Sequence, residues 1–218
     1  MKFEKVMKGC ANIDDFFFVQ VGAFDGVSFD PINKYVTEFN WSGLLVEPIP
    51  CHFNSLKKNY INNKNLIFEQ VAVTGECGFV SLGYYPPDSK YVRNKLKTDA
   101  GRYGESCIGK HITHKKRKIH KFIREVEVEA ITYKNLVERN DVHKVDFLQI
   151  DTEGHDFEVI KSIGWDDIHS DLIPNIIHFE SNLLNMDEVS NFLINRGYSL
   201  YEGSSNIDTL AIKDSVKK

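Results

Sequence analysis

The chain has 218 residues, of which 42% are hydrophobic and 27% are charged. A chain of this length and composition is long enough for one well-buried core and short for two, so we expect a single domain over residues 1–218. The formal net charge of −4 argues against an extended nucleic-acid footprint over the whole surface.

The cysteines argue against a zinc-binding or disulfide-stabilised protein, and the N-terminus argues against a secreted one. Cys10, Cys51, Cys77 and Cys107 are widely spaced and form no C-x-x-C pair, which favours free thiols in a reducing cytosol over a zinc site or a disulfide framework. The first residues lack the apolar core of a signal peptide, and no apolar run is long enough to cross a bilayer. We therefore expect a soluble, cytoplasmic protein without a membrane span.

The rest of the chain is organised around a stretch near its start. An apolar run over residues 16–21 stops at Gly22, and Gly26 follows four residues later. This pattern predicts a buried strand that enters a tight turn and then a helix. Glycines at such a turn let the backbone approach a ligand closely, and free amides there can bind a polar group. An ordinary strand–turn–helix joint without a ligand is the alternative.

Strands and helices alternate along most of the remaining sequence. Asp30 and Pro31 have the residue types of a helix start, an N-cap followed by a proline in the first turn. The alternation predicts an α/β fold with a mostly parallel sheet, right-handed crossovers and helices on both faces. We expect strands over residues 16–21, 44–46, 66–73, 78–85, 123–131, 145–150, 173–180 and 208–212, and helices over 31–40, 50–62, 132–140, 155–163 and 186–196.

Polar residues follow several of the predicted strands. In parallel sheets a ligand binds beyond the carboxyl ends of the strands, so these residues should converge at one edge. A single acid after a strand is more often a helix cap or a solvated turn, but four acids at one edge are harder to explain in that way. The residues are Gly22 to Asp25, Glu47, Ala72 to Thr74, Asp151 with Glu153, and Glu180.

The position of Glu47 indicates the kind of ligand. It ends the second strand about twenty residues after the glycine turn, where a carboxylate can accept both hydroxyls of a ribose. The turn lacks the third glycine of the dinucleotide motif, and Asp25 would repel a pyrophosphate, so an oxidoreductase is a weaker interpretation. A ligand with an ammonium group and a ribose fits better, and S-adenosylmethionine has both.

Four motifs of this sequence resemble the FkbM family of S-adenosylmethionine-dependent methyltransferases. They are Val-Gln-Val-Gly-Ala-Phe-Asp-Gly, Leu-Leu-Val-Glu-Pro, the block from Asp146 to Lys161 that contains Ile-Asp-Thr-Glu-Gly, and Ile-Ile-His-Phe-Glu. They follow one another in order over roughly residues 15–200. The resemblance implies a Rossmann-like class I methyltransferase with a seven-stranded sheet and an antiparallel last pair of strands. It also implies O-methylation, usually of a sugar or polyketide hydroxyl.

The resemblance also implies roles for individual residues. Gly22, Ala23, Asp25 and Gly26 would line the methionine part of the cofactor, Glu47 the ribose, and Pro48, Ala72 and Val73 the adenine side.

The expected reaction requires a base. Methyl transfer is an in-line displacement, so alignment supplies much of the catalysis, and the acceptor hydroxyl still loses its proton. Asp151 should lie nearest the transferred methyl group and the cofactor, with Glu153, His155 and Glu180 as the other catalytic candidates. His155 is either this base or a solvent-facing helix residue. Alternatively, Asp151, Glu153 and Glu180 hold Mg²⁺, which prefers oxygen ligands and acidifies a hydroxyl.

One basic segment stands apart from the acidic remainder. Residues 90–124 contain about a dozen of the 27 Lys and Arg residues, opposed only by Asp99 and Glu105. The segment is either a solvated loop or a lid that holds an anionic acceptor, such as a phosphorylated or acidic sugar. We expect an O-methyltransferase for a hydroxyl of a sugar, glycan or nucleotide-linked sugar. A nucleic-acid-binding protein or RNA methyltransferase that uses residues 90–124 is the alternative.

Overall fold

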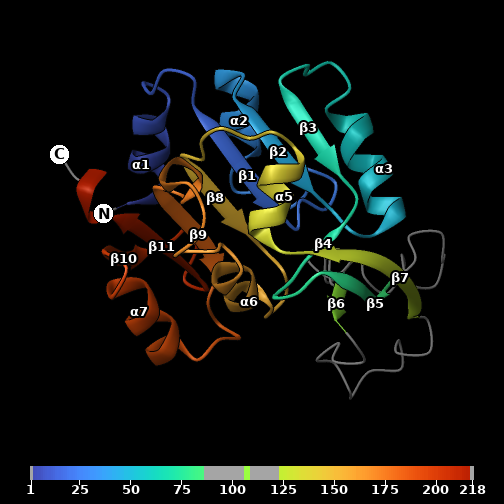
Figure 1. Cartoon of the computed structure of the whole chain (residues 1–218). Helices are drawn as coiled ribbons and strands as arrows, with labels where there is room; N and C mark the ends of the chain where they lie inside the picture. Colours follow the sequence, from blue (N-terminus) through green and yellow to red (C-terminus); the bar gives the residue numbers. More distant parts are fainter. Residues whose placement is uncertain (1, 86–105, 109–122, 217–218) are drawn as a thin grey trace.

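The computed structural model describes residues 2–85, 106–108 and 123–216 of the chain. Within these residues the central layer is a seven-stranded sheet with the order β10-β11-β9-β8-β1-β2-β3 (Figure 1). Strand β11 is antiparallel to both of its neighbours, and the other pairs are parallel. The predicted mostly parallel sheet is therefore confirmed. Its strands are β1 (Phe17–Val21), β2 (Ser42–Val46), β3 (Leu66–Glu69), β8 (Phe147–Ile150), β9 (Ile176–Glu180), β10 (Tyr198–Glu202) and β11 (Asp208–Lys213).

Helices cover both faces of this sheet because successive strand residues point to opposite sides. In β1, Val19 and Val21 pack into a core with α5, α6 and α7, whereas Phe18 packs into a second core with α1, α2 and α3. The helices are α1 (Phe3–Cys10), α2 (Asn33–Phe39), α3 (Pro50–Asn59), α5 (Tyr133–Arg139), α6 (Asp156–Lys161) and α7 (Met186–Ile194), with 3-10 turns at Ser170–Leu172 and Asp214–Val216.

A second, four-stranded sheet lies beside the carboxyl end of β3, and its order is β4-β7-β5-β6 (Figure 1). Its strands are β4 (Ala72–Val73), β5 (Gly78–Tyr84), β6 (Ser106–Ile108) and β7 (Arg124–Ile131).

The prediction of one strand over residues 66–73 is wrong. Strand β3 pairs with β2 and ends at Glu69, and two residues later the chain joins the second sheet as β4, which pairs with β7. Ala72 packs there against Ile49 and Leu82. Leu66 is the buried residue of β3, whereas Val71, Ala72 and Val73 are all buried, so the apolar run belongs to two different sheets.

Besides the short strand β6 and the two 3-10 turns, α1 and β10 were not predicted. The buried residues of α1 are Phe3, Val6, Met7 and Cys10, so a helical periodicity was present in the sequence. Strand β10 has one buried residue followed by partly exposed ones and lacks the alternation that identifies a strand.

Helix α2 starts later than predicted, because Ile32 and not Asp30 occupies its N-cap position. The helix begins at Asn33, and the Asp30 carboxylate accepts hydrogen bonds from the amides of Ile32 and Asn33 at 2.8 and 3.1 Å. Asp30 therefore satisfies the first free amides of this segment, as an N-cap does.

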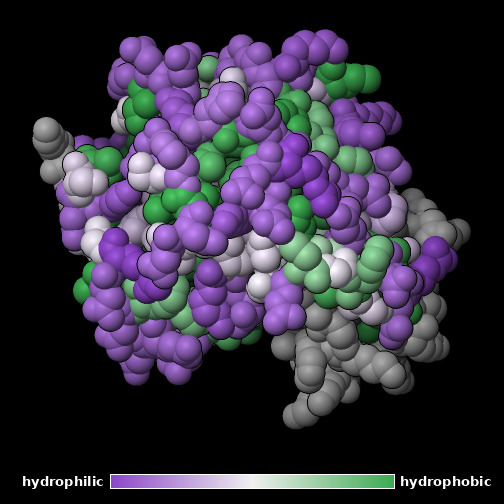
Figure 2. Space-filling model, in the orientation of Figure 1, coloured by the Kyte–Doolittle hydropathy of each residue, from purple (hydrophilic) through white to green (hydrophobic). Residues whose placement is uncertain are grey.

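The basic segment, residues 90–124, lies outside the described residues except for β6, Ile123 and Arg124. Among the described residues, Cys10, Cys51 and Cys77 are free thiols as predicted, and no helix is long and apolar enough to cross a membrane. The face drawn in Figure 2 is mostly hydrophilic, with hydrophobic residues in small patches.

Candidate functional site

The glycine turn after β1 lies between the ends of two neighbouring strands. The amides of Gly22 and Ala23 donate to the carbonyl of Val46, which ends β2, at 3.0 and 2.9 Å. Gly22 has φ +80°, and a Cβ there would lie 1.9 Å from the carbonyl oxygen of Asp151, which follows β8. At Gly26, with φ +72°, a Cβ would lie 2.4 Å from the ring of Tyr60. Both glycines are therefore required by conformation and by space.

Glu47 holds the turn from the end of β2. Its carboxylate is almost completely buried, and its two oxygens accept hydrogen bonds from the amides of Phe24 and Ile49 at 3.0 and 2.9 Å. The Nδ1 atom of His52 lies 3.7 Å from one of these oxygens. A carboxylate oxygen has two acceptor positions, so the oxygen that bonds to Phe24 keeps one for a further donor such as a ribose hydroxyl, while His52 lies beside the other oxygen.

Asp25 is used by the loop itself. One carboxylate oxygen accepts from the amides of Val27 and Ser28 at 3.0 and 2.7 Å, and the other accepts from the Ser28 hydroxyl at 2.7 Å. Phe24 and Phe29 have φ of 50° and 59°, which strains bulky residues. Asp25 therefore stabilises a strained loop beside the glycine turn.

The residues expected on the adenine side are enclosed to different degrees. Pro48 is half-buried directly after Glu47. The side chains of Ala72 and Val73 are buried in the hydrophobic cores.

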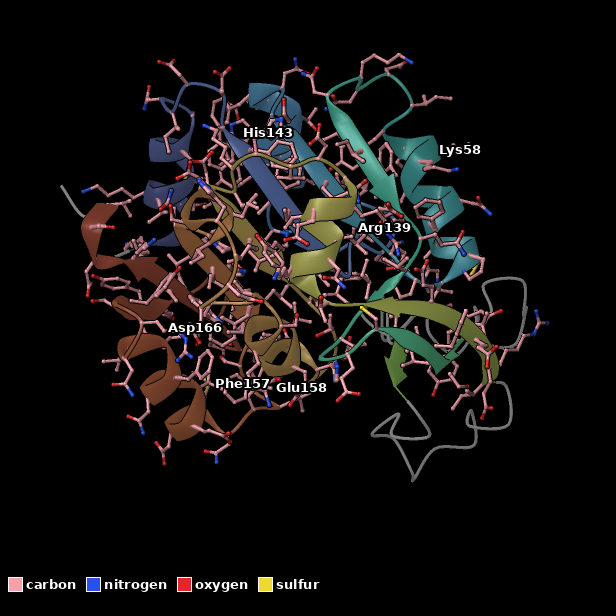
Figure 3. The ribbon with its side chains drawn as sticks, in the orientation of Figure 1. Lys58, Arg139, His143, Phe157, Glu158 and Asp166 are labelled. Atoms are coloured by element: carbon pink, nitrogen blue, oxygen red, sulfur yellow. The ribbon has the colours of Figure 1, made fainter. Side chains whose placement is uncertain are left out.

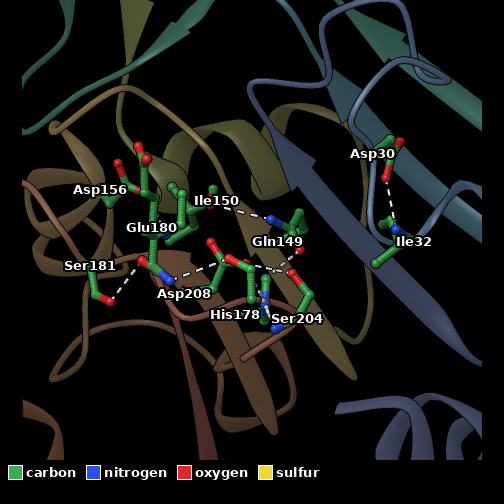
Figure 4. A network of polar contacts seen from close by, with 12 residues as sticks. Asp30, Ile32, Gln149, Ile150, Asp156, His178, Glu180, Ser181, Ser204 and Asp208 are labelled. Atoms are coloured by element: carbon green, nitrogen blue, oxygen red, sulfur yellow. Dashed lines mark hydrogen bonds and ion pairs between the residues drawn. The ribbon is translucent and has the colours of Figure 1, made fainter. Parts of the chain in front are cut away.

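Five acids gather beyond the carboxyl ends of β8 and β9. Sequence reasoning named Asp151, Glu153 and Glu180, and the structure adds Asp156 and Asp208; Figure 4 shows Asp156, Glu180 and Asp208 near one another. Asp151 is exposed, yet its pKa is raised well above the ordinary value, by the loss of hydration among protein atoms and by the charges of the other four acids. Water still reaches this side chain. Substitution of the other four acids would therefore test how much their charges raise the pKa of Asp151.

The two acids that sequence reasoning missed are placed by long-range structure. Asp208 is the register partner of Glu180 in the antiparallel pair β11–β9, and Asp156 begins α6 with its side chain fully buried. Burial raises the pKa of Asp156, against hydrogen bonds from Thr152 and from the amide of Glu180. An acid in the first turn of a predicted helix was the only signal for Asp156 in the sequence.

A buried network beside these acids holds Asp208. The Nδ1 atom of His178 lies 2.8 Å from Oε1 of Gln149, and its Nε2 atom accepts from the amide of Ser204 at 2.9 Å. The Ser204 hydroxyl donates to Asp208 at 2.5 Å. Since an amide can only donate, Nε2 is the unprotonated nitrogen and Nδ1–H donates to Gln149. Burial lowers the pKa of His178, against the nearby charge of Asp208.

His155 directly precedes Asp156 but lines a hollow whose lining includes none of the five acids. It lines a hollow of about 530 Å³ together with Thr74, Glu158 and Lys161, and Figure 3 shows Glu158 on α6. Its Nε2 atom is buried and has no hydrogen-bond partner among the described residues. Burial lowers the pKa of His155, with Glu158 raising it and Lys161 lowering it. The charges of Glu153 and Glu180 therefore act on Asp151, whereas none of these three carboxylates lines the hollow beside His155.

The alternative of a magnesium site is not supported by the described residues. In the part of the chain that the structure describes, no three His, Cys, Asp or Glu side chains are grouped so that they could hold a metal ion. Glu153 has φ 54° and Gly154 has φ 96°. The chain therefore turns sharply after Asp151.

Comparisons with known proteins give one family match. The model of the methyltransferase FkbM domain matches residues 20–200. A search of curated proteins found no match.

Several solved structures are similar in fold. A precorrin-6y C5,15-methyltransferase from Geobacter metallireducens is 12% identical, with 96% of this chain and 86% of that chain covered and a TM-score of 0.46. An rRNA methylase from Streptococcus thermophilus is 9% identical, with 96% and 94% covered and a TM-score of 0.47. The N-terminal domain of human METTL16 in complex with SAH is 14% identical, with 97% and 66% covered and a TM-score of 0.45.

Proposed function

This chain belongs to the FkbM methyltransferase family, and on that premise we propose that it transfers a methyl group from S-adenosylmethionine to a hydroxyl of a sugar, glycan or nucleotide-linked sugar. Its fold is that of the Rossmann-like class I methyltransferases. The observation that carries the proposal is the glycine turn at Gly22, which lies between Glu47 and Asp151 at the carboxyl edge of the sheet. A nucleoside-containing ligand binds at this edge in folds of this kind.

The proposed cofactor site has three parts. Gly22, Ala23 and Gly26 form the turn that lies against the methionine part. Glu47 keeps an acceptor position for a ribose hydroxyl on the oxygen that bonds to Phe24. Asp25 acts by shaping the loop. The adenine then lies toward Pro48 and the start of the second sheet.

The reaction needs alignment and one proton acceptor. A bond forms between the acceptor oxygen and the methyl carbon while the carbon–sulfur bond breaks, so the sulfonium leaves as a neutral thioether. The hydroxyl proton goes to a carboxylate, and we assign this role to Asp151, with Glu153 and Glu180 beside it. The raised pKa of Asp151 makes it a stronger base than an ordinary aspartate. His155 faces Glu158 and Lys161 and has no part in this assignment.

The cofactor site is tested by calorimetry with S-adenosylhomocysteine and with NAD. We expect micromolar binding of S-adenosylhomocysteine alone, weakened at least about tenfold in Glu47→Gln, because the amide nitrogen places a donor where an acceptor is needed. Glu129→Gln on β7 is the matched control and should bind as the wild type does. Absence of S-adenosylhomocysteine binding in the wild type would overturn the proposal.

The acceptor class is tested with S-adenosylmethionine labelled in its methyl group, offered with sugars, nucleotide-linked sugars, glycans and RNA. Label should enter a sugar hydroxyl, and Asp151→Asn should lower the rate about 100-fold or more. Label in RNA instead would replace the sugar by a nucleic acid as the acceptor. Neutralising Lys115 to Lys118, which lie outside the described residues, should raise the KM of an anionic acceptor and leave cofactor affinity unchanged.

A further inference from the structure

The carboxylate of Asp156 connects two segments that carry acids of the site. Its Oδ2 atom accepts from the hydroxyl of Thr152 at 2.7 Å and from the Thr152 amide at 3.3 Å. Its Oδ1 atom accepts from the amide of Glu180 at 3.1 Å (Figure 4). The side chain is fully buried. One buried group therefore joins the turn after β8 to the end of β9.

This connection extends the sheet beyond its last paired residues. The ladder between β8 and β9 ends with Ile150 opposite Phe179. The next residues of the two strands are Asp151 and Glu180, and Thr152 lies between Asp151 and Glu153. Past the end of the ladder, the hydrogen bonds of Asp156 tie the two segments together and set their spacing.

A role confined to α6 does not account for these contacts. An acid in the first helical turn is favoured by the positive end of the helix dipole. That effect needs no bond to another strand, whereas Asp156 accepts from the amide of Glu180. A donor faces each of the two side-chain oxygens of Asp156. A carboxylate accepts at both positions, whereas the side-chain amide of an asparagine accepts at only one. Burial of such a charge is costly unless hydrogen bonds satisfy it.

We propose that Asp156 is a positioning residue of the methyl-transfer site, which holds Asp151 and Glu180 at their working distance by bonding to Thr152 and to the Glu180 amide. This inference rests on the proposed function. Asp156 contacts neither cofactor nor acceptor in this role. It acts through the backbone of the residues beside it, so its loss affects the alignment of the acceptor more than the binding of the cofactor.

The test compares Asp156→Asn and Thr152→Val with Thr152→Ser, which keeps the hydroxyl. We expect Asp156→Asn and Thr152→Val to lower kcat about 10- to 100-fold, because misplacement of a reacting group by about 1 Å has effects of that size. S-adenosylhomocysteine affinity should stay within about threefold, and Thr152→Ser should retain most of the wild-type kcat. The Glu180 amide should exchange its hydrogen faster in Asp156→Asn than in the wild type.

Asp146→Asn is the matched control. Asp146 is also buried and accepts from a backbone amide, that of Phe17 at 2.9 Å, but at the opposite end of β8. The Asp146→Asn variant should be less stable than the wild type and should keep the wild-type kcat. An equal fall of kcat in Asp146→Asn and Asp156→Asn, or an unchanged kcat in Asp156→Asn, would overturn the proposal. If Asp156→Asn does not fold, the contrast between Thr152→Val and Thr152→Ser decides.

Failure of the proposed function gives a different result. In that case the wild type transfers no methyl group to any acceptor, and the kinetic comparison is replaced by hydrogen exchange. Faster exchange of the Glu180 amide in Asp156→Asn and Thr152→Val, with wild-type exchange in Asp146→Asn, supports the connection. Unchanged exchange in the first two variants refutes it.

Discussion

His178 shows at the scale of one residue how the fold selects a protonation state. It is almost completely buried, and its Nε2 atom accepts from the Ser204 amide, so a proton at Nε2 would break this bond. Asp208 lies 3.9 Å from the same nitrogen and favours the charged form. Burial outweighs that attraction, and the pKa of His178 is lowered. The neutral imidazole therefore links β8, β9 and the β10–β11 turn.

This neutral state predicts a pH dependence of stability. In the unfolded chain a histidine binds a proton near pH 6.5, whereas in the fold the lowered pKa keeps His178 neutral, so stability falls as the pH falls below about 6.5. Between pH 7 and pH 5 the loss is about 2 kcal/mol at most. We expect the difference in unfolding free energy between the wild type and His178→Gln, measured in urea, to narrow by that amount over this range.

Comparing the wild type with His178→Gln removes the pH effects of other titratable groups, some of which have the opposite sign. Burial raises the pKa of Asp30 to about 6, and the pKa values of Asp151 and Asp156 are also raised. A carboxyl with a raised pKa stabilises the fold as the pH falls, which is the opposite sign, and it does so in both proteins. A difference that stays constant from pH 7 to pH 5 would contradict the prediction.

At the scale of elements, α1 closes one face of the sheet. The ring of Phe3 is nearly buried and lies 4.6 Å from the ring of His178 and 6.4 Å from that of Tyr35, measured between centroids. The helix is only eight residues long, so it depends on such packing for its stability. It therefore also contributes to the burial that keeps His178 neutral.

Phe3→Ala tests this contribution. Removal of a buried aromatic ring leaves a cavity, and we expect a loss of about 3 kcal/mol in unfolding free energy, measured in urea. Phe79→Ala is the control because Phe79, on β5, is 73% exposed, and its loss should be within about 0.5 kcal/mol. Similar losses in the two variants would mean that α1 does not pack on the sheet in solution.

At the scale of the whole molecule, the proposed cofactor site draws on elements far apart in the chain. The turn after β1, the end of β2 and the end of β8 meet through hydrogen bonds of Gly22, Ala23 and Asp151 to neighbouring strands. A ligand bound there contacts segments that separate when the chain unfolds. Its binding therefore stabilises the entire fold.

The linkage between binding and folding gives a further prediction. At a concentration of 100 times its Kd, S-adenosylhomocysteine should stabilise the fold by about 2.7 kcal/mol. For a chain of this size this raises the Tm by about 5–10 °C, measured by scanning calorimetry. NAD at the same concentration is the control and should leave the Tm unchanged. An equal increase with both ligands would show that the effect is not specific to the proposed cofactor.

Local patterns in the sequence determined the fold class and much of the candidate site. The apolar run before Gly22 predicted β1, and the alternation of strands and helices predicted a mostly parallel sheet. Gly22 and Gly26 lie in the predicted turn after β1, and both have positive φ. These features could be predicted because strand periodicity and glycine conformation depend on neighbouring residues.

The tertiary structure alone decided which side chains meet. The antiparallel register placed Asp208 opposite Glu180. His155 lines a hollow with Glu158 and Lys161, and the apolar run over residues 66–73 is divided between two sheets. The periodicity of a sequence predicts that a residue is buried. Which residue it contacts depends on segments distant in the chain, and no local pattern specifies that.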